Sequence, residues 1–149
     1  MRLYLAAPLF TQAERRWLRQ LAAALRKDGH RVFLPQETAK QLLRNGPFNP
    51  AKVFEANRRN MDVSDIVIAV LDGPDADSGA AWECGYATGR GKPVIGIRTD
   101  FRGSEDDGLN IMLRRSISEL VKHQSLDESV GTIIRQLRSA LKRFGSANR

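Results

Sequence analysis

Cysteine is almost absent from this sequence of 149 residues, in which Cys84 is the only one. A single cysteine cannot close a disulfide within the chain or supply several thiolates to a metal ion. No histidine lies near Cys84 in the sequence to activate a thiol nucleophile, so we expect a small packing residue. This composition is typical of a reducing compartment, and we expect a cytoplasmic protein.

Long hydrophobic runs are missing as well. The apolar start of the chain, MRLYLAAPLF at residues 1–10, is too short to cross a membrane and lacks a signal-peptide cleavage site. It therefore predicts a buried strand and no membrane partner. The hydrophobic fraction of 42% and the charged fraction of 28% are those of an ordinary globular domain. We expect one domain over residues 1–145 and a frayed tail at 146–149.

Glycine-rich phosphate loops are absent too. The sequence contains no G-x-x-x-x-G-K-[ST] motif, and the loop expected after the first strand is AAPLFTQAE rather than G-x-G-x-x-G. A nucleotide cofactor therefore has little support, and we expect no cofactor. The net charge of +7 would suit nucleic acid, but much of it lies on the polar faces of two expected helices. Without interleaved aromatic residues, we expect no nucleic-acid partner.

The sequence does contain an alternation of apolar strands with amphipathic helices. The expected strands are residues 3–6, 31–35, 66–71, 93–97 and 120–122. The expected helices are residues 11–28, a segment that begins near Pro50 and includes Met61, and residues 79–90, 109–117 and 127–144, with a loop over 36–49. This order predicts a single-domain α/β fold, with about five parallel strands in one open sheet and helices on both faces.

In such a sheet, ligands bind at the carboxyl ends of the strands, so the loops after the first, third and fourth strands form the expected site. Glu83 lies early in the helix after the third strand, for which Ser78 is the expected N-cap. Small neighbours such as Ala81 and Gly85 would let a ligand approach its carboxylate closely. The alternative is that Glu83 only complements the positive end of the helix at the surface.

Aspartates surround Glu83 in this region. Asp72 ends the third strand and Asp77 precedes the helix, so we expect both to project into the crevice of Glu83 as substrate-binding residues. Clustered carboxylates suit a polyhydroxyl ligand, and Mg²⁺ is the alternative. His30 precedes the second strand, at the opposite end of the sheet, and His123 is expected at the surface. Neither histidine supports a metal site, and we expect no metal.

The most specific segments of the sequence are YLAAPLF at 4–10, SDIVIAVLDGPDADSGAAWECGYATGRGKPVIGIRTD at 64–100 and NIM at 110–112. Together they resemble the nucleoside 2-deoxyribosyltransferase family over most of residues 2–122. The resemblance implies a flavodoxin-like, Rossmann-like fold and base exchange between 2′-deoxynucleosides, as in nucleoside salvage. A glutamate at the position of Glu83 attacks C1′, expels the base and holds the deoxyribosyl group as an ester until another base accepts it. The implied partners are deoxynucleosides and free nucleobases.

The resemblance also implies roles for four residues near the carboxyl edge of the sheet. Tyr4 matches a tyrosine that orients the glutamate, although packing in the core is the alternative for a residue in a buried strand. Phe10 and Pro8 match a wall against which the base lies. Asp77 matches a residue that holds the sugar 5′-hydroxyl.

Two further residues match groups that a neighbouring subunit supplies. These are Asn110 and Met112, so the resemblance implies a homo-oligomer, a dimer or larger. One departure concerns Asn57, where the transferases usually carry an aspartate for base contact and protonation. An amide donates and accepts hydrogen bonds but cannot deliver a proton as an acid. Gln36, just after the second strand, is expected to share base recognition.

Two other functions stay open from the sequence. One is a related hydrolase that cleaves deoxynucleoside 5′-monophosphates with water as the acceptor. Its relatives carry serine where this chain has Asp77, and again near Asn110, to receive the phosphate. Because the Asp77 carboxylate would repel a 5′-phosphate, we favour the free nucleoside. The other is a non-catalytic nucleotide-binding module on the same sheet.

Overall fold

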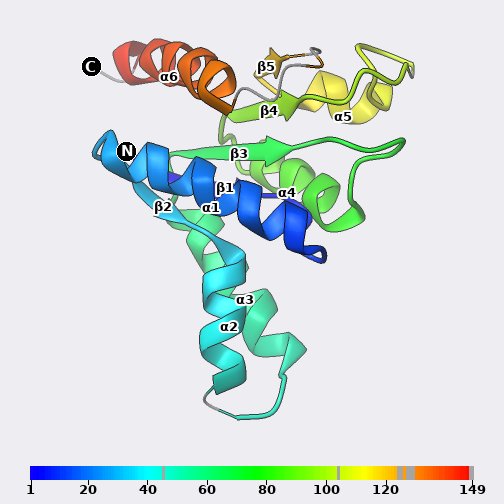
Figure 1. The fold of residues 1–149 in the computed structure, drawn as a ribbon. Helices are drawn as coiled ribbons and strands as arrows, with labels where there is room; N and C mark the ends of the chain where they lie inside the picture. The colour runs from blue at the N-terminus through cyan, green and yellow to red at the C-terminus, as the bar shows by residue number, and fades with distance from the viewer. Residues whose placement is uncertain (45, 104, 124–125, 127–129, 148–149) are drawn as a thin grey trace.

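A computed structural model describes residues 1–44, 46–103, 105–123, 126 and 130–147 of the chain. Its centre is a parallel sheet of five strands in the order β2-β1-β3-β4-β5 (Figure 1). The strands are β1 (Arg2–Ala6), β2 (Arg31–Phe33), β3 (Ile66–Val70), β4 (Val94–Arg98) and β5 (Glu119–Lys122). The predicted parallel α/β architecture is therefore confirmed, with β3 in the middle of the sheet.

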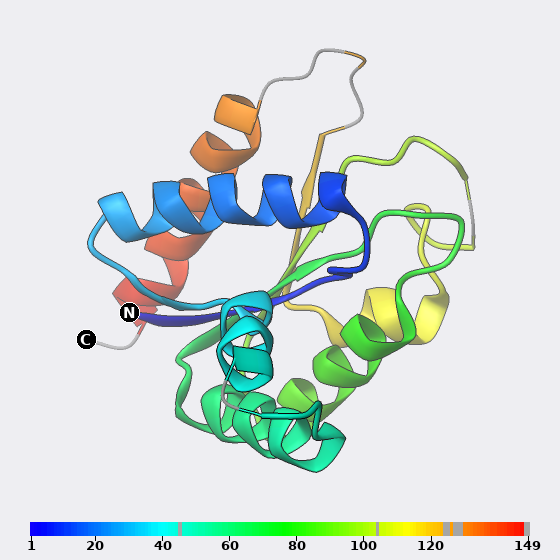
Figure 2. The same cartoon turned by 60° about the horizontal axis from the view of Figure 1, so that its bottom comes forward.

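Helices cover both faces of this sheet. They are α1 (Gln12–Lys27), α2 (Pro35–Arg44), α3 (Pro50–Val63), α4 (Ser78–Gly89), α5 (Ile111–Ser116) and α6 (Val130–Ala147). Figure 2 shows α1 and α6 on one side of the strands and α3, α4 and α5 on the other. The fold therefore has two hydrophobic cores, one on each face of the sheet.

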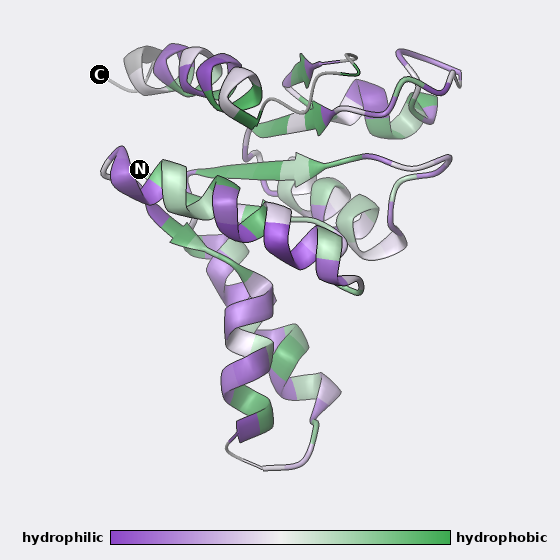
Figure 3. Ribbon diagram, viewed as in Figure 1, coloured by the Kyte–Doolittle hydropathy of each residue, from purple (hydrophilic) through white to green (hydrophobic). Residues whose placement is uncertain are grey.

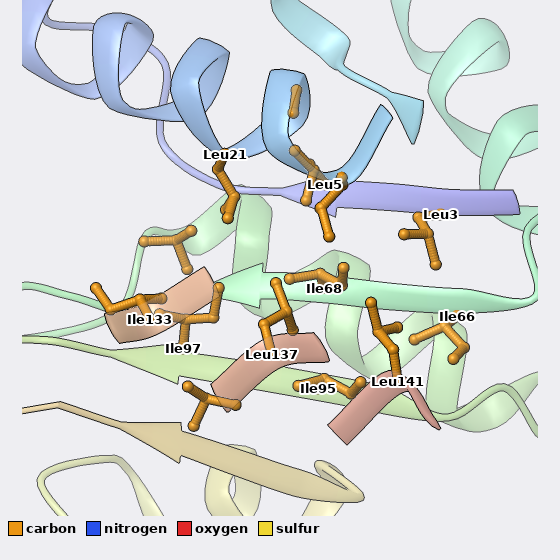
Figure 4. Close-up of a cluster of buried hydrophobic side chains, with 14 of the residues drawn as sticks. Leu3, Leu5, Leu21, Ile66, Ile68, Ile95, Ile97, Ile133, Leu137 and Leu141 are labelled. Atoms are coloured by element: carbon orange, nitrogen blue, oxygen red, sulfur yellow. The ribbon is translucent and has the colours of Figure 1, made fainter. Parts of the chain in front are cut away.

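The first core lies between the sheet and the helices α1 and α6. Leu5 and Ile68 of the sheet meet Leu21 of α1 and Leu137 of α6 (Figure 4). β3 is hydrophobic along its length (Figure 3), because neighbours cover it on both faces. Burial of this apolar surface is the main force that holds the layers together.

Strand β1 directs alternate side chains to the two faces, as the pleat of a strand requires. Leu3 and Leu5 belong to the core under α1 and α6, whereas Tyr4 and Ala6 belong to the core under α3, α4 and α5. Tyr4 therefore lies on the same face of the sheet as α4, the helix that carries Glu83.

The structure corrects two predicted boundaries. The segment 36–49, expected as a loop, begins with α2, which starts at Pro35 and shortens β2 to Phe33. Helix α2 lies beside α3 and projects from the sheet (Figure 1), and Pro35 is its only buried residue. The N-cap of α4 is Asp77 rather than Ser78, because the Asp77 side chain accepts the backbone N–H of Ala80.

The predicted start of α1 is confirmed, whereas the predicted end of α6 differs from the structure. Thr11 caps α1 and forms the reciprocal capping box with Glu14 that their spacing predicts. Helix α6 continues to Ala147, two residues into the expected tail, while residues 127–129, 148 and 149 lie outside the described residues. No helix in the described part of the chain has the length and apolar character that a membrane span requires.

Candidate active site

Glu83 and Tyr4 meet at the face of the sheet that α4 covers. The Tyr4 hydroxyl donates a hydrogen bond of 2.5 Å to Glu83 Oε1, although the residues lie 79 positions apart in the sequence. The ring of Tyr4 is fully buried and stacks on Phe33 of β2, with centroids 5.3 Å apart and an angle of 17° between the planes. This packing holds the hydroxyl toward α4, so Tyr4 both fills the core and orients the carboxylate.

Burial changes the protonation of this pair. It raises the pKa of Glu83 to about 7, because desolvation disfavours the carboxylate, and the negative charge of Asp77 raises it further. The hydrogen bond from Tyr4 acts in the opposite direction and lowers the pKa of Glu83. The pKa of Tyr4 lies well above its ordinary value, through burial first and then the charge and hydrogen bond of Glu83. Tyr4 is therefore a neutral donor at neutral pH, while Glu83 exchanges its proton there.

Asp77 is the N-cap of α4, the helix that carries Glu83. Its Oδ1 accepts the Ala80 N–H at 2.9 Å, which caps the helix. Among the described residues, Oδ2 forms no hydrogen bond within the chain, so its acceptor sites are available to a ligand. The charge of Asp77 also acts on Glu83, so the structure brings Tyr4, Glu83 and Asp77 together.

Asp72 has a different environment. Its Oδ1 accepts the backbone N–H groups of Thr99 and Asp100 at 2.6 and 2.9 Å, and its Oδ2 accepts the Thr99 hydroxyl at 2.6 Å. None of these hydrogen bonds leads to Glu83. With Pro8 and Trp17, Asp72 also lines a pocket of about 340 Å³ beside α1, on the other face of the sheet from Tyr4.

The resemblance assigns base recognition to two amides, Asn57 and Gln36. Asn57 Oδ1 on α3 and Gln36 Oε1 on α2 are buried, and neither has a hydrogen-bond partner among the described residues. Gln36 donates through Nε2 to the carbonyl of Arg15 at 3.2 Å, which holds its side chain in place. A buried acceptor without a donor is costly, so these two oxygens are positions where a donor on a ligand would bind.

The loop after β1 carries Pro8 and Phe10. The side chain of Phe10 is 73% exposed, so in one chain it lies at the surface rather than in the core. Arg15 fixes the backbone of this loop, because its guanidinium donates to the carbonyls of Leu9 at 2.9 Å and Phe10 at 2.7 Å.

Asn110 and Met112 belong to the start of α5. The Asn110 side chain accepts the Met112 N–H at 3.0 Å and so caps the helix. The side chain of Met112 is 78% exposed. Within the described part of the chain, neither residue has a hydrogen bond to Tyr4, Glu83 or Asp77.

One buried charged residue was missed in the sequence. Arg98, at the end of β4, is 1% exposed and donates to the carbonyls of Leu71, Gly73 and Arg102 at 2.5, 3.1 and 3.2 Å. An arginine directly after the apolar run PVIGI was the available signal, because a strand buried on both faces rarely ends in a charge without a specific partner. Among the described residues, no group of three or more acidic, histidine or cysteine side chains could hold a metal ion.

Comparison with known proteins gives a consistent result. A family model described as nucleoside 2-deoxyribosyltransferase matches residues 3–113. A 2-deoxyribosyltransferase from Bacillus psychrosaccharolyticus is 26% identical, with 89% of this chain and 96% of that chain covered and a TM-score of 0.70. A conserved protein from Enterococcus faecalis V583 is 25% identical, with coverage of 94% and 98% and a TM-score of 0.71.

A more distant structure shares the fold alone. The CMP N-glycosidase BcmB of Clostridium botulinum is 16% identical, with 95% of this chain and 99% of that chain covered and a TM-score of 0.61. The comparison with curated proteins found no match.

Proposed function

The chain belongs to the nucleoside 2-deoxyribosyltransferase family, and on that premise we propose that it exchanges the base of 2′-deoxynucleosides through a covalent intermediate on Glu83. The observation that carries this proposal is the partly buried hydrogen bond between Tyr4 and Glu83. A carboxylate that is desolvated, oriented by a neutral donor and adjacent to a second acid suits attack on an anomeric carbon.

The reaction proceeds in two displacements. In the first, Glu83 attacks C1′, the bond between C1′ and the base nitrogen breaks, and its electron pair leaves with the base, which takes up a proton. In the second, a nitrogen of another base attacks C1′ and loses its proton, and the ester oxygen leaves to restore the carboxylate. Because Tyr4 holds Oε1, Oε2 is the oxygen available for attack. Two inversions at C1′ retain its configuration.

The environment of Glu83 favours both displacements. Desolvation raises the pKa of Glu83 to about 7. It also removes the hydrating water that would lower the reactivity of the carboxylate as a nucleophile. The Tyr4 hydroxyl stabilises the carboxylate when it is the leaving group of the second displacement. At pH values above 7 most of Glu83 is ionised and ready to attack.

The substrate groups have matching partners in the site. We assign the free acceptor oxygen of Asp77 to the 5′-hydroxyl of the sugar, and Phe10 to the face of the base. Pro8 lines the pocket beside α1 on the other face of the sheet, so it is left out of this assignment. Asn57 and Gln36 offer buried carbonyl oxygens to donors on the base edge. Since Asn57 cannot donate a proton as an acid, we expect base preference to depend on hydrogen bonding rather than on protonation by this residue.

We also propose that a second copy of the chain completes the site. Met112 is 78% exposed and Ile111 beside it is 51% exposed, which is unusual for two large apolar side chains on a helix of six residues. A subunit contact would cover them and bring Asn110 to a neighbouring substrate. Base exchange of this kind is salvage chemistry, and we place it in the cytoplasm.

An exchange assay tests the proposal. The protein is incubated with 2′-deoxyadenosine and a second free base, and the products are separated by chromatography. We expect a new deoxynucleoside, and we expect Glu83→Ala to lower its rate by several orders of magnitude, because the nucleophile is lost. Glu119→Gln, on the distant strand β5, is the matched control and keeps wild-type exchange.

The same assay separates the alternatives. Release of free base and deoxyribose without a new nucleoside indicates a hydrolase, and preference for a 5′-monophosphate would contradict the role of Asp77. Binding without turnover, unchanged in Glu83→Ala, indicates a non-catalytic module. Wild-type exchange in Glu83→Ala would refute the covalent mechanism.

A further inference from the structure

Two side chains of opposite charge lie between the loops that follow β3 and β4. Arg98 is fully buried at the end of β4, and Asp72 is half-buried directly after β3. We call residues 71–77 the β3–α4 loop and residues 99–110 the β4–α5 loop. These two loops deliver Asp77 and Asn110, the N-caps of α4 and α5.

Arg98 binds the carbonyl groups of both loops. Its guanidinium donates to Leu71 and Gly73 in the β3–α4 loop and to Arg102 in the β4–α5 loop. No carboxylate forms an ion pair with Arg98 within the residues that the structure describes, so its charge is balanced by backbone dipoles. A planar guanidinium presents five N–H donors in a fixed fork over three nitrogens, whereas a lysine ammonium presents three on a single nitrogen.

The β4–α5 loop packs directly against the edge of this guanidinium. Gly108 has a φ of 85°, and a Cβ atom placed on it would lie 2.8 Å from Arg98 Nε. The same Cβ would lie 3.1 Å from the carbonyl oxygen of Arg102. The position therefore requires glycine both for its backbone conformation and for the close approach of the loop to Arg98.

Asp72 binds the amide groups of the opposite loop. It accepts from the backbone and hydroxyl of Thr99 and from the backbone of Asp100, as described above. In return, Asp100 accepts the Gly73 N–H at 3.0 Å. Each of these contacts joins one loop to the other, so the loops cannot separate without breaking hydrogen bonds to buried or half-buried charges.

We propose that Arg98 and Asp72 are positioning residues that set where Asp77 and Asn110 stand relative to Glu83. The inference rests on the proposed function, since it assigns Asp77 to the 5′-hydroxyl of the substrate. Neither residue touches the reacting atoms. Each acts through the backbone of the two loops, and Asp72 is then part of the support of the site rather than a substrate ligand.

The test compares two substrates that differ only at the 5′ position. Arg98→Lys keeps the charge but not the three carbonyl contacts, and its kcat/KM is measured with 2′-deoxyadenosine and with 2′,5′-dideoxyadenosine. We expect the wild type to prefer the 5′-hydroxyl by about tenfold or more. In Arg98→Lys the KM for 2′-deoxyadenosine rises and this preference falls toward one, while the reaction of the dideoxy substrate changes little. A merely structural role would lower both substrates by the same factor.

Two further variants disturb the contacts between the same two loops without changing Arg98. Gly108→Ala pushes a methyl group toward the guanidinium with Arg98 intact, and Asp72→Asn weakens the opposite set of contacts; both are expected to lose the 5′ preference. If Arg98→Lys does not fold, these two decide the outcome. Arg115→Lys, an exposed arginine on α5 paired with Asp106, is the control that keeps the preference. Folded variants that retain the wild-type preference overturn the proposal.

A binding measurement separates this inference from the proposed reaction. In a Glu83→Gln background, calorimetry gives the affinity for the two nucleosides without turnover. Loss of the 5′ preference on adding Arg98→Lys supports the positioning role even if the wild type proves to be a hydrolase. Absence of any 5′ preference in the Glu83→Gln protein overturns it, whatever reaction the wild type performs.

Discussion

At the scale of single residues, Glu83 is governed by two opposing effects. Burial and the charge of Asp77 raise its pKa, and the hydrogen bond from Tyr4 lowers it, with a result of about 7. The Tyr4 hydroxyl thus keeps a buried acid ionisable at neutral pH. The contributions of Tyr4 and Asp77 to the pKa of Glu83 come from different residues, so a substitution can remove either one separately.

Removing Tyr4 and removing the charge of Asp77 should shift the pH dependence of exchange in opposite directions. We expect kcat/KM to rise with pH through about 7 as Glu83 ionises. Tyr4→Phe removes a contact that lowers the pKa of Glu83, so the rise moves to higher pH and the maximal rate falls by about tenfold or more. Asp77→Asn removes a contribution that raises it, so the rise moves to lower pH. Shifts of both profiles in one direction would contradict this account.

The stability of the protein should also depend on Glu83. Its pKa in the folded state, about 7, exceeds the ordinary value of 4.5, so the folded protein binds this proton more tightly than the unfolded chain does. Wild-type stability should therefore fall as pH rises from about 4.5 to 7. Glu83→Gln has no such charge, and it should gain about 1–3 kcal/mol relative to wild type between pH 5 and pH 8.

Urea denaturation at pH 5 and pH 8 measures this difference. Glu119→Gln is the control, because it changes the same side-chain type far from the site. If Glu83→Gln and the wild type show the same dependence of unfolding free energy on pH, Glu83 is not desolvated in the folded protein.

At the scale of the elements, the N-cap of helix α4 combines a structural group with a proposed functional group. Asp77 uses one oxygen to cap the helix, and its other oxygen is the one that we propose for the sugar 5′-hydroxyl. The cap fixes the side chain, so the direction of the functional oxygen follows from the geometry of the helix terminus.

Two substitutions of Asp77 should separate these roles. Asp77→Ala loses the hydrogen bond to Ala80, and we expect a loss of about 1 kcal/mol in the free energy of unfolding. Asp77→Asn keeps an acceptor at this position and should change stability by only a few tenths of a kcal/mol. Both should lose much of the preference for the 5′-hydroxyl. Equal stability of the two variants in urea denaturation would show that the cap contributes little.

The elements that the sequence predicts are those with an apolar pattern. The run at 66–71 indicated β3, and the spacing of Thr11 and Glu14 indicated the start of α1. Helix α2 was missed because its first residue, Pro35, was assigned to the preceding strand, and the asparagine, glycine and prolines over 45–50 indicated a loop. The cap of α4 was placed one residue late because adjacent aspartate and serine are equally good N-caps, and only the direction of the side chain distinguishes them.

The residues of the candidate site differ in the same way. Glu83 and Asp77 were predicted from their place after the third strand and from the resemblance, and their catalytic and binding roles stay predictions. The place of Arg98 directly after PVIGI marks it as unusual, but its partners are backbone carbonyls, and the sequence does not show which carbonyls these are. The engagement of Asp72 with Thr99 depends on how two loops meet, and that is set by the whole sheet rather than by neighbouring residues.

At the scale of the whole molecule, one chain leaves several large apolar side chains exposed to water. Phe10 and Met112 are 73% and 78% exposed, and Phe54 and Trp82, each 48% exposed, are in tilted contact with centroids 5.6 Å apart on the outer side of α3 and α4. Such exposure is typical of a surface that another subunit covers. A homo-oligomer with shared sites would account for it.

Mixing two inactive variants tests whether the sites are shared. Glu83→Ala removes the nucleophile, and Asn110→Asp keeps the helix cap but places a negative charge beside the neighbouring site. We expect each alone to be nearly inactive. After subunits are mixed at random, about half of the dimers contain one intact site of two, so exchange should return to about a quarter of the wild-type rate. No recovery, with mixed dimers verified by mass spectrometry, would place the complete site in one chain.

The order of the strands has a consequence for how the chain is made. β1 pairs only with strands that come later, β2 at Arg31 and β3 at Ile66. During synthesis on the ribosome, the first apolar segment therefore emerges long before its central neighbour exists. Parallel pairing of distant segments is slow, and an unpaired strand invites aggregation. We expect nascent chains that stop before residue 66 to depend on chaperones, and full-length chains to be released from them once β3 is inserted.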